Sequence, residues 1–425
     1  MRCCIVLLLI PLAYYAPAGE AGETLHEIDI EAAARLAITR SEQVLAAEAR
    51  RHAARSEGSG LTAFGRPQIG TGAGWAYRGD DYLGPMPGSS ADQHYRLDAR
   101  IEQLLWSSGR LTARRDQARA LDQIATGDLR QQQLSVALRA RSACSDVLLA
   151  RARIAVTGQR VDQRRGELRD AEALFEAGSV TQLDVRQARL GLIAAESQAD
   201  EAAAEERQAL QELAASLALD PNALTVNDAL GPPEDLAALV VAARSSIGDD
   251  PEFMVLRGQQ NRLAAEEAVW RANGRPQLHA YGEAFTQGPR VDDLHESWSV
   301  GLSLRWDIYS GGAFDAARDA ARHQNRALRQ HQDSLLRERQ REVEQLDILI
   351  ASLQRRITSQ QEAAILAADN YEDARRQYQA GLITLTRVGE SSLAVGETRF
   401  VLDALIHRLQ LVAHRLRWLA GSDLE

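Results

Sequence analysis

The sequence feature that most constrains the fold is a short pattern that occurs twice. Residues 174–181 (LFEAGSVT) correspond to residues 377–384 (QYQAGLIT), 203 positions later. In both copies an aromatic residue, an Ala-Gly pair and a threonine lie between two long segments of helix-forming residues. Glycine at a helix end supplies the positive φ that a tight reversal requires. The pattern therefore predicts two helical hairpins in a duplicated chain, with structural repeats at residues 19–230 and 231–425.

The first residues and the composition indicate an exported protein. Residues 1–18 combine Arg2, an apolar run and a small-residue cleavage site, which predicts a secretory signal peptide. Two of the three cysteines lie in that segment, so the mature chain would keep Cys144 alone and form no internal disulfide. The net charge of -10 argues against a nucleic-acid-binding protein. After residue 18 the sequence has no run of about 18 apolar residues that would predict a membrane-spanning helix.

In each half, the helical composition is interrupted by segments with the period of a β-strand. The tetrapeptide Gly-Arg-Pro-Gln opens such a segment at residues 65–68 and again at 274–277. We predict β-hairpins at about 66–104 and 275–308, with the longer loop, residues 79–92, in the first. One face of the clearest strands is small or charged, as in Arg96, Asp98 and Arg100. The other face is bulky and apolar, and its predicted lipid-facing residues are Tyr95, Leu97, Ile101, Trp298, Val300, Leu302, Leu304 and Trp306.

Each hairpin precedes a long helical hairpin, predicted at about 110–219 and 313–420. The first helix would span about 63 residues, or about 95 Å at the helical rise of 1.5 Å per residue. In the last helix, apolar residues from Leu402 to Leu419 follow alternating steps of three and four, which is the seam of a coiled coil. Rods of this length are not needed in an ordinary globular domain.

Strand length and alternation suit a transmembrane β-barrel, although an ordinary half-buried sheet fits the strands alone equally well. The charged face needs water and the opposite face needs an apolar environment, which favours the barrel. The smallest barrels have about eight strands, so several chains must contribute. A secreted periplasmic coiled-coil scaffold or adaptor without a barrel is the alternative. A plain porin would not need the long helices.

The duplication, the repeated strand openings, the turn at residues 309–312 and the two hairpin tips together resemble the outer-membrane efflux protein (TolC-like) family. The resemblance implies an α+β membrane protein in the outer membrane with a long periplasmic extension. It also implies a homotrimer in which each chain gives four transmembrane strands to a 12-stranded β-barrel and its helices to a periplasmic α-helical barrel. Members are passive exit ducts of tripartite efflux or type I secretion systems. Their partners are outer-membrane lipid, a periplasmic adaptor (membrane fusion) protein and an inner-membrane pump of RND or ABC type.

The resemblance also assigns roles to residues near the tips. Expected adaptor-docking residues are Gly178, Ser179, Val180, Thr181, Gly381, Leu382, Ile383 and Thr384. Expected residues of a periplasmic constriction are Tyr378, Asp184, Arg387 and Glu390. Some family members have a ring of acidic residues here, and Arg387 stands where one of these carboxylates would be expected. We hypothesise that Arg387 pairs with Asp184 between neighbouring hairpins and holds the tube shut.

The sequence gives no indication of an enzyme. It shows no nucleophile-base arrangement, and we expect no catalytic residues, no cofactor and no metal. Gly70, Gly72 and Gly74 lack the spacing and the following helix of a phosphate-binding loop. His279 and His295 have no ligand spacing around them.

Overall fold

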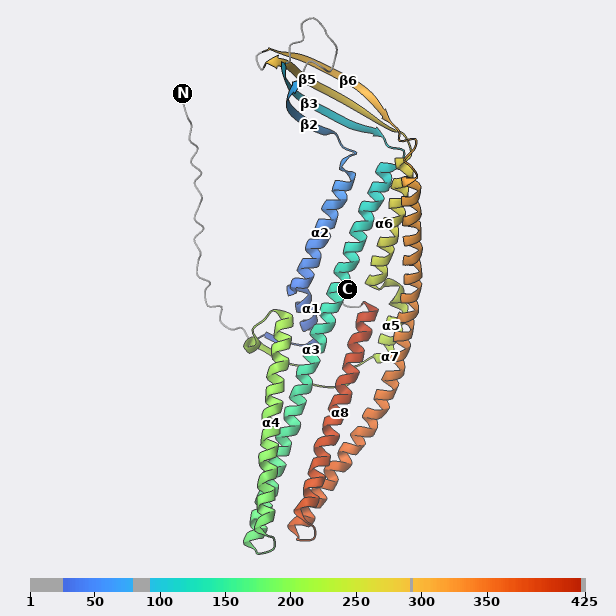
Figure 1. The fold of residues 1–425 in the computed structure, drawn as a ribbon. Helices are drawn as coiled ribbons and strands as arrows, with labels where there is room; N and C mark the ends of the chain where they lie inside the picture. The colour runs from blue at the N-terminus through green and yellow to red at the C-terminus, as the bar shows by residue number, and fades with distance from the viewer. Residues whose placement is uncertain (1–25, 79–91, 291–292, 422–425) are drawn as a thin grey trace, which may run out of the picture.

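The computed structural model describes residues 26–78, 92–290 and 293–421. Figure 1 shows an elongated molecule with a β-sheet at one end and two helical tips at the other. The predicted signal peptide, residues 1–18, and the predicted loop up to residue 91 lie outside the described residues. No helix in the described ranges is both long and apolar enough to cross a membrane.

Four long helices give the molecule its length. The first hairpin consists of α3 (Arg110–Glu176) and α4 (Gln182–Leu217), and the second of α7 (Ala313–Gln379) and α8 (Leu385–Ala420). Both α3 and α7 contain 67 residues, and both α4 and α8 contain 36. None of the four contains proline, which would interrupt its hydrogen bonds. At 1.5 Å per residue, α3 and α7 are about 100 Å long.

Shorter elements precede each β-hairpin. Helices α1 (Ile30–Arg40) and α2 (Glu42–Ala63) meet at Ser41, and α5 (Leu236–Ser246) is followed by α6 (Pro251–Asn273). Two 3₁₀ turns, η2 (Pro221–Ala223) and η3 (Ile247–Asp249), connect neighbouring elements. Strands β1 (His26–Ile28) and β4 (Leu224–Val226) pair in parallel, a contact that the sequence pattern does not predict.

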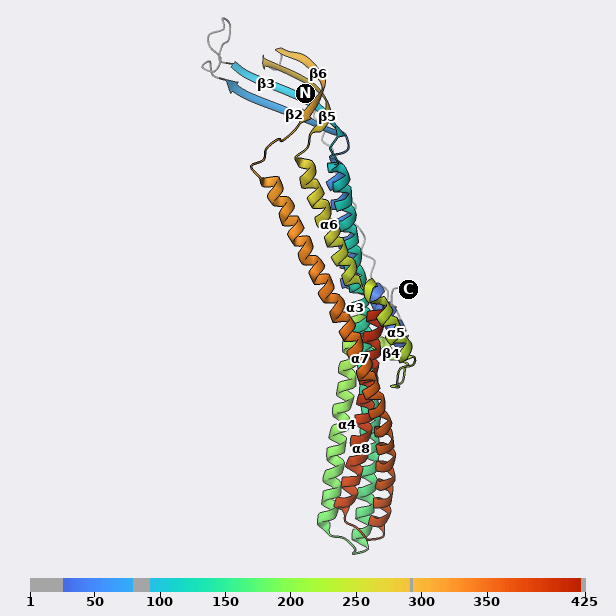
Figure 2. The ribbon, with the colours of Figure 1, turned by 90° about the vertical axis from the view of Figure 1, so that its right-hand side faces the viewer.

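The helices form a layer whose members change halfway along. Beside the sheet the order of packed neighbours is α2, α3, α6, α7, and towards the tips it is α4, α3, α8, α7. Helices α3 and α7 therefore run through both halves, while the others end near the middle. There α1 packs on α3 and α5 packs on α8, and Figure 2 shows β4 and α5 beside the long helices.

The sheet contains β2 (Gln68–Arg78), β3 (Asp92–Trp106), β5 (Gln277–Arg290) and β6 (Asp293–Arg305). All neighbours are antiparallel, in the order β2-β3-β5-β6. The second predicted hairpin, at about 275–308, corresponds to β5 and β6, but β6 ends at Arg305 rather than near residue 308. Trp306 therefore follows the strand, and its indole nitrogen donates a hydrogen bond to the Gly274 carbonyl at 3.2 Å. The chain then turns through Gly311 and Gly312, whose φ angles are +65° and +84°.

Three hydrophobic clusters hold the helices together. One joins α5, α6, α7 and α8 and contains all six residues of the predicted coiled-coil seam, Leu402, Leu405, Leu409, Val412, Leu416 and Leu419. A second joins α1, β1, β4 and the first hairpin, and includes buried Cys144. The third lies at the tips, where the two hairpins meet. The described sheet contributes to none of the three, and among its described large apolar side chains Leu104 alone is buried.

Candidate functional site

The bulky face of the sheet is exposed along its whole width. Cross-strand neighbours place Ile69, Ile101 and Val300 in one row, with Gly282 between the last two. Of the predicted lipid-facing residues, seven are between 46% and 79% exposed: Leu97, Ile101, Trp298, Val300, Leu302, Leu304 and Trp306. Tyr95 is half-buried. Monomeric soluble proteins rarely leave so large an apolar surface uncovered.

The opposite face of the sheet carries a ladder of paired charges. Arg96 contacts Asp98 at 3.4 Å and Glu283 at 2.6 Å, and its guanidinium lies over the Phe285 ring at 4.6 Å. Further along, Glu102 contacts Arg100 at 3.3 Å and His279 at 3.0 Å. The pairs with Glu283 and His279 join β3 to β5, and the other two lie within β3. Such paired charges are suited to a wet surface. The two faces of one sheet therefore require two different environments.

The two hairpin tips have the same backbone geometry. Gly178 and Gly381 have φ angles of +70° and +71°, in the left-handed region that glycine adopts without strain. In the first tip the Ser179 amide donates to the Leu174 carbonyl at 2.8 Å, and in the second the Leu382 amide donates to the Gln377 carbonyl at 2.9 Å. These bonds satisfy carbonyl groups at the end of each helix. The repeated sequence thus specifies the same reversal twice.

The tip residues divide into an exposed and a packed group. Leu382 is 74% exposed, and Gly178, Ser179, Thr181, Gly381 and Thr384 are also exposed. Val180 and Ile383 pack against the cluster between the hairpins. An exposed leucine at a hairpin tip offers an apolar contact to a partner.

The residues after the two glycines differ in their contacts. Thr181 and Asp184 form a capping box, in which the Thr181 amide donates to the Asp184 carboxylate at 2.8 Å. Hydrogen bonds from Thr181 hold the pKa of Asp184 below its usual range. Thr384 makes no side-chain cap, and Arg387 forms an exposed ion pair with Glu390 at 3.1 Å. Within one chain, Asp184 and Arg387 therefore have partners on their own helices.

Tyr378, which the resemblance places at a constriction, lies between the two hairpins of one chain. Its side chain is 2% exposed and packs with Tyr371, Leu385 and Val388 between the hairpins. Burial raises its pKa. The aromatic ring forms part of the contact between the two hairpins. Within one chain Tyr378 is therefore a packing residue, and its place in a constriction stays a prediction.

Polar residues that the sequence patterns did not indicate also connect the hairpins near the tips. Asp170 of α3 binds Arg375 of α7 at 3.0 Å. Arg164 donates to Glu167 at 2.7 Å and to the Gly389 carbonyl of α8 at 3.4 Å. Glu167 is 1% exposed, and burial raises its pKa. Asp170 and Arg375 lie within about two turns of the repeated tips, which is the signal that would have identified them.

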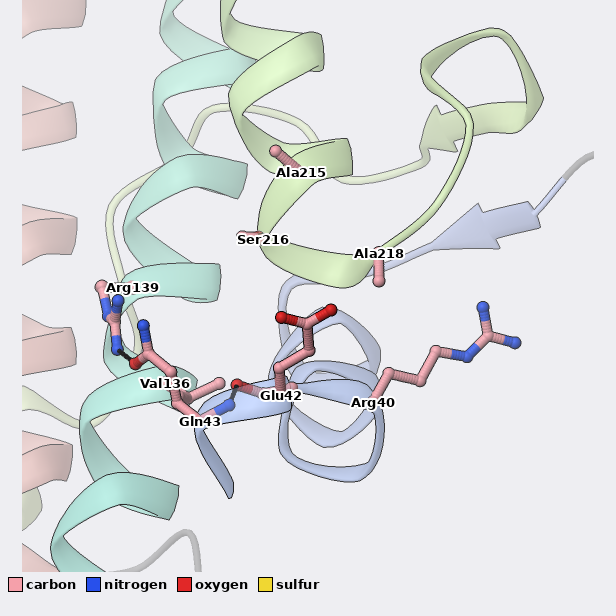
Figure 3. A pocket seen from close by; sticks show the side chains of 9 residues that line it. Arg40, Glu42, Gln43, Val136, Arg139, Ala215, Ser216 and Ala218 are labelled. Carbon is pink, nitrogen blue, oxygen red and sulfur yellow. Dashed lines mark hydrogen bonds between the residues drawn. The ribbon is translucent and has the colours of Figure 1, made fainter. Parts of the chain in front are cut away.

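A separate hollow of about 340 Å³ lies at the junction of α1 and α2, against α3 and the end of α4. Figure 3 shows Arg139 bonded to Gln43 on one side and Arg40 extending away from the hollow on the other. Among the described residues, no group of three or more His, Cys, Asp or Glu side chains could hold a metal ion.

The comparisons with known proteins agree with this architecture. A family model described as "Outer membrane efflux protein" matches residues 33–219 and 243–417. The fold is similar to that of the outer membrane protein VceC from Vibrio cholerae, with a TM-score of 0.80, 16% identity, and coverage of 92% of this chain and 96% of that one. The MtrE outer membrane channel of Neisseria gonorrhoeae gives a TM-score of 0.77 at 15% identity, covering 92% and 89%. The CmeC outer membrane channel of Campylobacter jejuni gives 0.72 at 16%, covering 98% and 94%. A search of curated protein sequences gave no match.

Proposed function

The chain belongs to the outer membrane efflux protein family, and on this premise we propose that it is the exit duct of a tripartite efflux or type I secretion system. It conducts substrate passively from a periplasmic adaptor protein and an inner-membrane pump of RND or ABC type to the exterior. The proposed location is the outer membrane, with the helices extending into the periplasm. The duct has no catalytic step, so it needs neither a catalytic residue nor a cofactor.

The observation that carries this proposal is the two-faced sheet at the end of about 100 Å of helix. Its apolar face suits lipid and its charged face suits a water-filled lumen. Strands β2 and β6 are at the edges of the sheet, and exposed edges are not tolerated in a bilayer. We propose that three copies join edge to edge into a 12-stranded barrel, continued by an α-helical barrel. Equal helix lengths in the two halves support the duplication.

We propose that the adaptor docks on the two tips. The candidate contacts are Gly178, Ser179, Val180, Thr181, Gly381, Leu382, Ile383 and Thr384. The apolar Leu382 side chain is the most exposed apolar contact among them. The same end of the duct carries exposed Arg387 and Glu390, and we propose that Arg387 narrows the passage by pairing with Asp184 of a neighbouring hairpin in the trimer.

Two substitutions in β6 test the barrel. Val300 and Ser299 are neighbours on opposite faces of the strand, and Val300 is 76% exposed. An arginine on the lipid face near the bilayer centre costs about 2–4 kcal/mol, whereas the lumen accepts charge. We expect Val300→Arg to abolish recovery of trimer from the outer membrane and Ser299→Arg to preserve it. Recovery of the unmodified protein in the soluble periplasm without detergent would instead support the scaffold reading.

Adaptor docking is tested by Leu382→Asp, with Val241→Asp of α5 as the matched control. Both side chains are exposed apolar residues, at 74% and 66%, but Val241 is far from the tips. We expect Leu382→Asp to reduce co-purification of the adaptor from cross-linked cells and Val241→Asp to leave it unchanged. Equal co-purification for both variants would show that the second tip does not dock the adaptor.

A further inference from the structure

Two adjoining hollows lie where α3, α4 and α8 meet, between the middle of the molecule and the tips. They measure about 250 Å³ and 260 Å³. Phe400 of α8 and Arg153 of α3 line both of them. Sites for drug-sized ligands usually measure about 300–1,000 Å³, so a ligand of that size would occupy both hollows and lie across Phe400.

The hollows are on the face of the helical layer that the shorter elements leave bare. Arg151 donates to the Val226 carbonyl of β4 and binds Glu206 at 2.8 Å. Arg153, two residues later, points about 200° away around the helix and binds Glu205. The covered face carries β4 and α5 (Figure 2), and α1 packs on α3 and α4 beside β4. In a tube the face that carries extra elements must be outside, because the inner face has to stay open for passage. In the tube of the proposed function, the hollows would therefore face the channel.

One cation already occupies the boundary between the hollows. The Arg153 guanidinium lies 5.2 Å from the centre of the Phe400 ring and binds Glu205 at 2.6 Å. A cation held between an aromatic face and a carboxylate is a recurring mode of cation recognition. Phe400 remains 39% exposed, so part of its ring is available to a second group.

The charge around Phe400 favours a cation as that second group. The two guanidiniums of the lining, Arg153 and Arg160, are outnumbered by carboxylates, which are Asp146, Glu201, Glu205, Glu212 and Glu397. Arg153 compensates Glu205, and His407 contacts Asp146 at 2.8 Å. In the described part of the chain, Glu201 and Glu212 have no ion pair to a basic residue.

We propose that these hollows, in the duct of the proposed function, form a contact site for organic cations with an aromatic or apolar body. The body lies on Phe400, and the charge lies among the carboxylates of α4 and α8. Such a site would retain amphipathic cations briefly at a fixed depth in the helical tube. It would not retain anions of the same shape.

The test uses purified trimer in planar lipid bilayers, without adaptor or pump. Tetraphenylphosphonium added to the tip side should reduce single-channel current in a concentration-dependent way. Tetraphenylborate, which has the same shape and the opposite charge, should not. Phe400→Ala should raise the half-blocking concentration of tetraphenylphosphonium about 5- to 30-fold, as expected for loss of a partly desolvated cation–π contact. Glu201→Gln should raise it in the same direction without altering the packing of Phe400.

Leu393→Ala is the matched control, because Leu393 is a similarly exposed apolar residue of α8 that lines neither hollow. Block that is equal for the two ions, or that is unaffected by Phe400→Ala and Glu201→Gln, would overturn the proposed site while leaving the duct intact. Absence of channels in the bilayer would overturn the proposed function and the site with it. A matching loss in Leu393→Ala would show that the effect is not specific to the hollows.

Discussion

Replacing Arg339 by methionine should open the middle of the molecule. The Arg339 guanidinium of α7 binds Asp250 at 2.9 Å, Glu252 at 2.8 Å and Glu342 at 3.2 Å. The Arg339 and Asp250 side chains are only 10% and 5% exposed. Burial lowers the pKa of Arg339. Its carboxylate partners, of which Asp250 has the largest effect, raise the pKa by more than burial lowers it, so the pKa lies above its usual value. The ion pair joins α7 to the start of α6, where Asp250 is also the N-cap.

The size of the expected stability loss follows from the buried carboxylate charge that Arg339→Met leaves without a partner. Removing one partner of a buried ion pair costs about 3–5 kcal/mol, because the other charge stays buried without compensation. The contacts with Glu252 and Glu342 are more exposed and each add less than about 1 kcal/mol. We therefore expect a loss of about 4 kcal/mol in the local stability of α6. Each 1.4 kcal/mol is a factor of ten, so amide hydrogen exchange in α6 should become about 1,000-fold faster.

The assay is exchange followed by mass spectrometry on the purified trimer, using peptides from residues 251–273. Arg341→Met is the control, because Arg341 is exposed and donates only to the Arg337 carbonyl of its own helix. A double variant, Arg339→Met with Asp250→Asn, should recover about half of the loss, because the asparagine keeps the cap without a buried charge. If Arg339→Met exchanges no faster than Arg341→Met, the ion pair does not stabilise this region and the reasoning is refuted.

Four further predictions concern the tips and the helices beside them. Thr181→Ala should lower the stability of the α4 N-terminus by about 1 kcal/mol and speed amide exchange in its first turn about fivefold. Thr384→Ala should speed exchange at the start of α8 less, because Thr384 makes no side-chain cap. Equal effects on exchange would contradict the capping argument. The pKa of Asp184 is lowered from 3.8 in the folded state. The stability that Asp184 gives to the start of α4 is therefore fully present above pH 3.8, and it should be lost as the pH falls through the lower folded-state pKa. Burial raises the pKa of Glu167 above 4.5, so the folded state binds more protons than the unfolded state and is stabilised as the pH falls through the raised pKa. Protection of amides near Gly389, measured relative to their intrinsic exchange rate at each pH, should therefore increase on lowering the pH. Glu167→Gln should remove that increase, and an increase retained in the variant would assign it to another group. Arg387→Ala should raise single-channel conductance, and Arg376→Ala, which removes another exposed arginine, is the control. An unchanged conductance in Arg387→Ala would refute the gating hypothesis.

The main elements of the fold could be predicted because their signals are local. Gly178 and Gly381 mark reversals that few other residues permit, and period-two alternation identifies β3 and β6 without any tertiary contact. The strand ends were less accurate, since Trp306 continues the alternation after β6 has ended. The pairing of β1 with β4 could not be predicted, because three-residue strands almost 200 positions apart carry no pattern of their own.

Side chains between the hairpins were the hardest to place from the sequence. Tyr378 follows the repeat pattern, but periodicity does not show which face of a helix meets another hairpin. Glu167 is a charged residue in a charged helix, so its burial depends on Arg164 and on a glycine more than 200 positions away. Phe400 and Arg153 lie on different hairpins, and only the packing of α3 beside α8 brings them together.

The open edges of β2 and β6 bear on inheritance as well as on folding. If each sheet is completed only by its neighbours, no chain can finish its membrane segment alone, and insertion and assembly are one event. A copy whose helices fold but whose strands cannot insert would then take one position in the trimer and prevent its two unmodified partners from forming a barrel. Mutations such as Val300→Arg should therefore be dominant when both forms are made in one cell.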